Sequence, residues 1–388
     1  MIRYLLATFL TLIAVHACAG SGTAEVILTS DEIRKVLRHG PWPPEAAPDP
    51  SNRASGDPRG IELGERLFSD PALSRNGDMT CATCHQADLN FADGLPRAQG
   101  RVRLDRNTLA LWNMRSFRWF GWSGDTDNLW AQSLTPILNS DEMAHSVESL
   151  RRAIETGPYK AALEDIFGSI EEHEAMETVV HVGKALAAYI ETLETGKTSF
   201  ARFRDALERR DLERASQYPA NAQRGLRIFI GEGRCAFCHS GPSFTNSEFH
   251  DAGVPYFLEP GRVDPGRSAG LEALEQSPFT LAGDFSDDPD KSGAWAVRSV
   301  RFSHSNFGIF RVPTLRRVAG TAPYMHDGSL PDLKSVVEHY NQIDTERLHA
   351  DGEVILRPIG LTEDEIADLV AFLETLSDDV TEPVAHPH

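Results

Sequence analysis

The chain contains Cys81-Ala-Thr-Cys84-His85 and, 154 residues further on, Cys235-Ala-Phe-Cys238-His239. In this Cys-x-x-Cys-His pattern, the two thiols attach covalently to the vinyl groups of a haem, and the adjacent histidine ligates the iron. A single copy could also be half of a zinc site, whereas two copies favour two c-type haems. We therefore expect two covalently bound haems c, with His85 and His239 as the proximal iron ligands.

A related segment precedes each motif, namely Gly64-Glu-Arg-Leu-Phe68 and Gly225-Leu-Arg-Ile-Phe229. Such an internal repeat predicts one structural unit per haem. Each segment also predicts the end of a short helix that leads into its motif. The expected organisation is a signal peptide (1–19), an extended lead-in (20–59), an N-terminal haem domain (60–216), a C-terminal haem domain (217–380) and a tail (381–388).

The periodic segments elsewhere in the chain are helical. Residues 176–193 and 361–376 carry apolar side chains at helical spacing, and the second segment opens with Thr362 and Glu365 in capping-box spacing. Residues 258–306 are rich in Gly, Asp, Pro and Ser, which predicts a long loop. Strand signals are weak. The expected fold class is mainly α, with two cytochrome c-like haem domains and long irregular loops.

The N-terminus has the pattern of an export signal. Arg3 precedes an apolar stretch at residues 4–15, and Ala17-Cys18-Ala19 resembles a cleavage site. The stretch is too short to span a bilayer, so no transmembrane segment is expected. Cys18 either leaves with the signal peptide or, if residues 15–18 act as a degenerate lipobox, is acylated in a lipoprotein. Because haem is attached to such motifs outside the cytoplasm, we expect a periplasmic protein.

The chain is strongly acidic. Its formal net charge is −19, and loss of Arg3, the one charged residue of the signal peptide, lowers the charge by one to −20. This charge argues against nucleic acid and anionic membranes as partners. It is compatible with a basic electron-transfer partner, although a solvated acidic surface that binds no partner is the more common meaning of such a charge.

The side of the first iron opposite His85 is expected to be open. No histidine occurs between His85 and His145, and the methionines in that region, Met114 and Met143, are expected to be structural. An open haem that cleaves peroxide needs a group that moves a proton between the two oxygens and a donor that polarises their bond. Glu142 and Gln132 are candidates for these roles, although each could instead be a solvated loop residue.

The second iron has four candidate distal ligands, Met325, His326, His339 and Tyr340. Tyr340 follows Leu333 by seven residues and shares its helical face, whereas His339 points elsewhere. From periodicity alone, Tyr340 is either a ligand or a core tyrosine.

From about Gly60 to Tyr340 the chain resembles the bacterial di-haem cytochrome c peroxidase and MauG family. Long ordered motifs carry the resemblance in addition to the haem motifs. They are Asp70-Pro71-x-Leu73-Ser74, Arg106-Asn107-Thr108, the block from Trp122 to Gln132, Asp264-Pro-Gly-Arg267, Val312-Pro-Thr-Leu-Arg-Arg317 and Thr321-Ala-Pro-Tyr-Met-His-Asp-Gly328.

The resemblance implies roles for particular residues. Glu142 matches the distal acid/base of the peroxide site, Gln132 matches the polar residue beside it, and Trp122 matches the tryptophan between the haems through which electron holes pass. Tyr340 falls where the peroxidases carry a methionine and MauG carries a tyrosine, and Met325 falls at a position that is not a ligand. A calcium site between the domains is also implied, formed by Asn107 and the backbone oxygens of Thr321 and Pro323.

One departure from MauG concerns the exit of oxidising equivalents. MauG has a surface tryptophan two residues before the first cysteine of its second motif, whereas this chain has Gly233. Trp119, Trp130 and Trp295 are alternatives, with core packing as the default interpretation of each. The segments around Trp42 and Trp122 also resemble an MbnH-like branch, associated with methanobactin, that oxidises a tryptophan of a partner protein.

The leading hypothesis is therefore a periplasmic di-haem oxidase of the MauG type. It would use hydrogen peroxide to oxidise a side chain of a partner protein through long-range electron transfer. One alternative is a di-haem cytochrome c peroxidase that takes electrons from a small cytochrome. Another is a di-haem electron carrier without peroxide chemistry.

Overall fold

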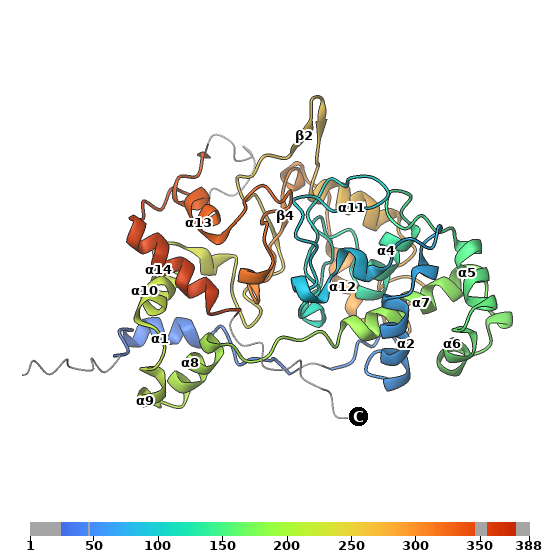
Figure 1. Cartoon of the computed structure of the whole chain (residues 1–388), viewed down its shortest axis with the longest axis horizontal. Helices are drawn as coiled ribbons and strands as arrows, with labels where there is room; N and C mark the ends of the chain where they lie inside the picture. The colour runs from blue at the N-terminus through green and yellow to red at the C-terminus, as the bar shows by residue number, and fades with distance from the viewer. Residues whose placement is uncertain (1–24, 46, 346–354, 378–388) are drawn as a thin grey trace, which may run out of the picture.

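The computed structural model describes residues 25–45, 47–345 and 355–377 (Figure 1). The predicted signal peptide, Cys18 and the tail at 381–388 lie outside these residues. Within the described residues, no helix is both long enough and apolar enough to cross a membrane.

The described chain is mainly helical, as expected, and its strands are short. Strands β1 and β4 pair antiparallel, as do β2 and β3. The strands are β1 (Phe249–His250), β2 (Phe257–Glu259), β3 (Arg262–Val263) and β4 (Phe310–Arg311). The α-helices are α1 (Ser30–Leu37), α2 (Pro58–Phe68), α3 (Cys81–Cys84), α4 (Leu129–Leu138), α5 (Val147–Thr156), α6 (Lys160–Phe167), α7 (Ala175–Ile190), α8 (Ser199–Glu208), α9 (Leu212–Ala215), α10 (Ala220–Ile230), α11 (Arg267–Gln276), α12 (Trp295–Ser299), α13 (Leu333–Asn341) and α14 (Glu363–Glu374).

Two separate apolar cores organise these helices. Helices α2, α4, α5 and α6 surround α7 in the first core, and α1, α8, α10, α13 and α14 form the second. Figure 1 shows the two groups at opposite ends of the molecule. The helices predicted at 176–193 and 361–376 are confirmed as α7 and α14, and Thr362 and Glu365 form the expected capping box.

The two cores do not simply follow the order of the chain. Helix α1 lies in the segment predicted to be extended and packs in the second core, where Val36 is fully buried. Helix α8 also belongs to the second core through Phe200 and Phe203. The chain therefore passes from the first core to the second between residues 190 and 200. The domain boundary at 217 stays a prediction.

The loop predicted at 258–306 also contains helices. Leu271 and Leu274 of α11 are buried, and α12 packs beside them through Ala296. The high polar content of this stretch concealed two short amphipathic segments, each with only a few buried apolar side chains. The β2–β3 hairpin projects from the molecule (Figure 1).

The repeated glycines allow close helix crossings at equivalent places in the two cores. A Cβ on Gly64 of α2 would overlap the backbone of Ala185 in α7, and a Cβ on Gly225 of α10 would overlap the backbone of Asp368 in α14. The helix that leads into each haem motif is thus held against one long helix of its own core. This confirms the short helices predicted before the motifs.

Substituting Gly225 with Ala should destabilise the protein. Overpacking of a core costs about 1–3 kcal/mol or more, which outweighs the gain of about 1 kcal/mol in helix propensity. Thermal unfolding of the holoprotein measures the change. Gly196→Ala is the matched control because nothing lies within 4 Å of its added methyl group. A Gly225→Ala protein as stable as this control would contradict the close crossing.

Candidate haem sites

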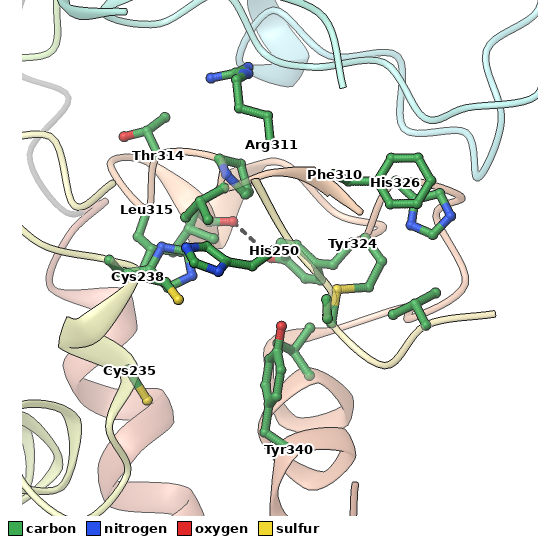
Figure 2. A pocket seen from close by; sticks show the side chains of 18 of the residues that line it. Cys235, Cys238, His250, Phe310, Arg311, Thr314, Leu315, Tyr324, His326 and Tyr340 are labelled. Carbon is green, nitrogen blue, oxygen red and sulfur yellow. Dashed lines mark hydrogen bonds between the residues drawn. The ribbon is translucent and has the colours of Figure 1, made fainter. Parts of the chain in front are cut away.

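A cavity of about 1010 Å³ lies at the second motif. Cys235, Cys238 and His239 line one part of it, and Tyr340 of α13 lines another. Figure 2 shows the Tyr340 hydroxyl pointing into the space next to the two cysteines. Mostly apolar walls of this size can enclose a large planar group.

Each motif histidine is oriented by the same device. His85 Nδ1 donates to the carbonyl oxygen of Phe91 at 3.0 Å, and His239 Nδ1 donates to that of Phe244 at 3.0 Å. Phe91 and Phe244 both have left-handed backbones, with φ of 58° and 51°. An imidazole whose Nδ1–H is fixed in this way presents Nε2 to a metal. Both histidines are therefore prepared as iron ligands.

Buried arginines at the second cavity fit a haem with carboxylate groups. Arg316 is 2% exposed, and its Nη1 and Nη2 have no hydrogen-bond partner among the described residues, as is also true of Arg311 Nη1. Both arginines line the cavity. Burial lowers the pKa of Arg316 to about 9, and no carboxylate of the described chain offsets this effect. A buried cation without an anion is costly, and haem propionates would supply the missing charge.

Residues of the lead-in (20–59) pack against Arg316 and Phe244 of the second site. The Trp42 ring lies 3.5 Å from the Arg316 guanidinium, and its indole Nε1 donates to Thr195 O at 2.8 Å. The His39 ring stacks on Phe244 at 4.7 Å. Residues that look like a linker in the sequence therefore support the arginine and the histidine-orienting phenylalanine.

Replacing Arg316 with Met should lower the reduction potential of the second haem, because a positive charge near the iron favours the reduced state. Spectroelectrochemical titration of the holoprotein measures this shift. Arg317→Met is the control, since the Arg317 guanidinium bonds Asn90 beside the first motif. Equal potentials in the Arg316→Met and wild-type proteins would refute the assignment.

The four candidate ligands of the second iron differ in their surroundings. Tyr340, Met325 and His326 line the cavity. His339 Nε2 instead donates to Ala252 O at 2.8 Å, which agrees with the expectation that it points elsewhere. His326 is stacked on Phe310 at 3.7 Å, and Figure 2 shows the pair to one side of the motif cysteines. Burial raises the pKa of the Tyr340 phenol.

Trp122 lies beside the same cavity and is nearly buried. Its indole Nε1 donates to Asn107 O at 2.8 Å, and its ring meets the edge of His326 at 6.5 Å. Trp122 is thus held in a fixed position at the wall of the second cavity.

At the first motif, Glu142 lies near the second cysteine. Burial raises the pKa of the Cys84 thiol to about 11, and the carboxylates of Asp93 and Glu142 add to that shift. Asn139, at the end of α4, donates to Glu142 Oε2 at 3.2 Å. Burial raises the pKa of Glu142. A half-buried carboxyl near a haem motif is a suitable proton carrier.

Gln132 is part of the helix that holds Glu142. It lies on α4, and its Oε1 accepts from Thr126 Oγ1 at 2.9 Å. Gln132 and Asn139, the C-terminal cap of α4, are seven residues apart. They therefore lie on the same face of this helix. Backbone bonds from Met143 to Pro136 and from His145 to Ile137 fold the chain back against the end of α4. Pro136 lies inside α4 and has no N–H to donate to the carbonyl of Gln132.

The nearest histidine after the first motif is engaged elsewhere. His145 Nε2 donates to Ala72 O at 3.1 Å, and Nδ1 bonds Ser149 Oγ at 2.7 Å. Met143 is buried in the first core, as expected of a structural residue. Met114 is also buried, but it lines the second cavity.

The residues of the expected calcium site belong to the lining of the second cavity. Asn107, Thr321 and Pro323 all line it. Asn107 uses Nδ2 to bond Leu95 O and its backbone N to bond His326 O, and neither bond uses Oδ1. An amide oxygen and two backbone carbonyls are oxygen donors of the kind that calcium prefers.

The alternative tryptophans have unequal surroundings. Trp130 is fully buried, and its Nε1 donates to Ser51 Oγ. Trp119 is buried in a small cluster with Leu274 and Ala296. Trp295 is 59% exposed. Gly233 packs against Ile228 at the cavity rim. The default of core packing holds for Trp130 and Trp119 but not for Trp295.

Sequence reasoning missed the arginines and the two left-handed phenylalanines. Arg316 stands in a motif already noted, Val312-Pro-Thr-Leu-Arg-Arg317, but the motif does not reveal which arginine is buried. Nothing in the sequence marks Phe91 and Phe244 as hydrogen-bond acceptors, because the carbonyl belongs to the backbone.

Comparisons with known proteins agree with this geometry. Residues 58–209 match the family model of di-haem cytochrome c peroxidases. The methylamine utilization protein MauG of Methylorubrum extorquens is 34% identical over 375 residues, covering 96% of this chain and 92% of the relative. Cytochrome-c peroxidase IdrP1 of Denitromonas iodatirespirans is 30% identical over 354 residues, covering 89% and 88%.

The fold has also been seen in a solved structure. The crystal structure of a MauG-like protein associated with microbial copper homeostasis has a TM-score of 0.66 at 23% identity, covering 86% of this chain and 95% of that chain. The chain therefore belongs to the di-haem cytochrome c peroxidase and MauG family, and it is a haem-dependent oxidoreductase that carries two haems and uses peroxide.

Proposed function

We propose that the protein is a periplasmic oxidase of the MauG type, which uses hydrogen peroxide to oxidise a side chain of a partner protein. The observation that carries this proposal is the inequality of the two sites. Tyr340 points into the second cavity next to the motif cysteines. At the first motif, both ring nitrogens of His145 are bonded to the protein, and Met143 lies in the core.

Haem, when bound, supplies an iron that reacts with peroxide and stores oxidising equivalents. The residues around the first site handle the protons. With haem bound, Glu142 would take a proton from one oxygen of the peroxide and return it to the other, so that water can leave. Asn139 holds the carboxyl in place through its hydrogen bond. Gln132 keeps the adjoining face of α4 polar.

Trp122 provides the connection between the sites. An indole is readily oxidised, and its N–H bond to Asn107 O stabilises positive charge on the ring. Tyr340 as a phenolate ligand would stabilise the ferric state of the second iron, which suits a haem that shares oxidising equivalents. The final oxidation takes place on a partner protein, and we propose a tryptophan as the side chain, as the MbnH-like resemblance implies.

The experiment that tests the proposal adds hydrogen peroxide to the diferric holoprotein. A long-lived oxidised state that involves both haems, formed without prior reduction, would support it. A strict need for prior reduction would reject it in favour of a cytochrome c peroxidase, the kind of enzyme named for the relative from Denitromonas iodatirespirans. Two low-spin haems and no reaction with peroxide would indicate an electron carrier.

Calcium at Asn107 is a further part of the proposal. Because Asn107 O holds the indole of Trp122, removing a cation from Asn107 Oδ1 should disturb that tryptophan. Treatment with EGTA is expected to slow formation of the peroxide-oxidised state, and added calcium should restore it. Asn107→Ala should make the rate insensitive to EGTA. An equal rate in EGTA and in calcium would refute a calcium site.

A further inference from the structure

Charge is distributed unevenly along this acidic chain. The whole chain has 57 acidic residues, yet residues 291–326 contain no Asp or Glu. Two arginines of this stretch do not contribute to the surface, because Arg311 and Arg316 are buried at the second cavity. Arg298 and Arg301 are exposed. They lie on or just after α12, on a protein whose net charge is strongly negative.

Two exposed aromatic side chains flank these arginines in the sequence. Trp295 is 59% exposed and Phe302 is 70% exposed. Exposed apolar side chains that lie close together with polar residues around them mark interaction sites. Tryptophan and arginine are also the residue types most enriched among those that dominate binding energy at protein interfaces. We define Trp295, Arg298, Arg301 and Phe302 as the α12 patch.

The α12 patch rests on a fixed support. Ala296 of α12 packs on Trp119 and on Leu274, which belongs to α11. Val297 and Val300 pack against the same cluster. The Arg118 guanidinium lies 5.1 Å from the Trp295 ring and forms an ion pair with Glu248. The exposed side chains are therefore presented by a packed segment.

The support also connects the α12 patch to the second site. Trp119 meets Phe249 at 6.4 Å, and Phe249 lines the second cavity. Arg267 lies over both rings, at 4.5 Å and 4.0 Å. A fixed cation over a ring raises the cost of positive charge on it. Trp119 and Phe249 are thus better suited to supporting the α12 patch beside the second cavity than to storing an electron hole.

We propose that the α12 patch is the docking surface for an acidic protein that supplies electrons to the second haem. Charge complementarity favours this partner, because the protein carries a strongly negative net charge that repels an acidic protein, whereas Arg298 and Arg301 attract one. The identification of the partner as an electron source rests on the proposed function, in which the partner is oxidised. Trp295 and Phe302 supply the apolar contact, and Arg298 and Arg301 orient the approaching protein.

Fully reduced flavodoxin, a small acidic electron-transfer protein, is the probe. Each reduced flavin gives one electron to one ferric haem of the holoprotein, and stopped-flow absorbance follows the haem. The Arg298→Glu/Arg301→Glu variant should be reduced about tenfold more slowly at low ionic strength, because electrostatic steering is lost. The difference should shrink as salt is added. Arg209→Glu/Arg210→Glu, with the same change in net charge at exposed positions, should stay within about twofold of wild type.

The aromatic contribution is tested at high salt, where charges are screened. Trp295→Ala/Phe302→Ala should still slow reduction by about tenfold there. In an Arg298→Lys/Arg301→Lys variant, carbodiimide should cross-link flavodoxin at positions 298 or 301. Unchanged rates in the Glu double variant, an equal loss in the Arg209/Arg210 control, or cross-links elsewhere would overturn the proposal.

Failure of this proposal can be told apart from failure of the proposed function. The reaction of the diferric protein with peroxide needs no partner and should be unchanged in all α12-patch variants. If peroxide does not react but the flavodoxin effects appear, the docking surface stands and the proposed function falls. If peroxide reacts normally but the flavodoxin effects are absent, the proposed function stands and the docking surface falls.

Discussion

Glu142→Gln is expected to slow the reaction of the diferric protein with hydrogen peroxide by about 10²–10⁴-fold, the usual contribution of a positioned proton carrier. The amide keeps the size of the side chain and can still bond Asn139, but it cannot accept a proton. Stopped-flow measurement of the haem spectrum gives the rate. Asp141→Asn, next in sequence and exposed, is the control and should react like wild type.

The pH profile distinguishes a catalytic carboxylate from a structural one. Burial raises the pKa of Glu142, so the carboxylate takes up a proton at a higher pH than an ordinary glutamate. The peroxide reaction should therefore decline as the pH falls through this raised pKa, and the Gln variant should lack that decline. A Gln variant within about threefold of wild type would exclude the proton-transfer role.

Stability should change in the opposite direction from activity. A carboxyl whose folded-state pKa is raised contributes stability while it is protonated, and this stability is lost as the pH rises through the folded-state pKa. The neutral amide avoids that loss, so Glu142→Gln should unfold no more easily than wild type at pH 7. If Glu142→Gln instead lowers the stability, misfolding would explain its loss of activity, and the proton-transfer role would lose this support.

Tyr340→Phe is expected to remove the low-spin spectrum of the second ferric haem and to raise its reduction potential. A phenolate stabilises ferric iron, and axial ligands shift haem potentials over a range of about 0.8 V. A rise of about 100 mV or more is therefore expected. Met325→Leu, which alters a neighbouring cavity residue, should leave both properties unchanged.

The same pair of variants decides between the two possible ligands. If Tyr340→Phe leaves the low-spin spectrum intact while Met325→Leu abolishes it, Met325 is the ligand and the second site resembles that of a peroxidase. Peroxide added to diferric Tyr340→Phe protein should also fail to yield the long-lived state that involves both haems. Electron paramagnetic resonance separates the high-spin and low-spin irons in each variant.

The sequence by itself determined the two haem attachments, the helical class and the family. These follow from local chemistry: a Cys-x-x-Cys-His motif needs only neighbouring residues, and the apolar periodicity of α7 and α14 needs only the helical repeat. The paired glycines of the repeat indicated equivalent helices for the same reason. Glu142, Gln132 and Tyr340 were candidates from the sequence pattern, but only the resemblance implied their roles, because single polar residues at these spacings have many possible roles.

Only the tertiary structure decided what surrounds each haem motif. Arg316 and Trp42 are far apart in the chain, and their stacking depends on how the lead-in packs against the second core. The acceptors Phe91 and Phe244 act through backbone carbonyls, whose direction is set by a left-handed φ and not by residue type. His145 is excluded as a ligand by its bonds to Ala72 and Ser149. Long-range contacts and backbone direction leave no local pattern, so the sequence could suggest that the two sites differ in their distal ligands, but the surroundings of each motif emerged only from the folded chain.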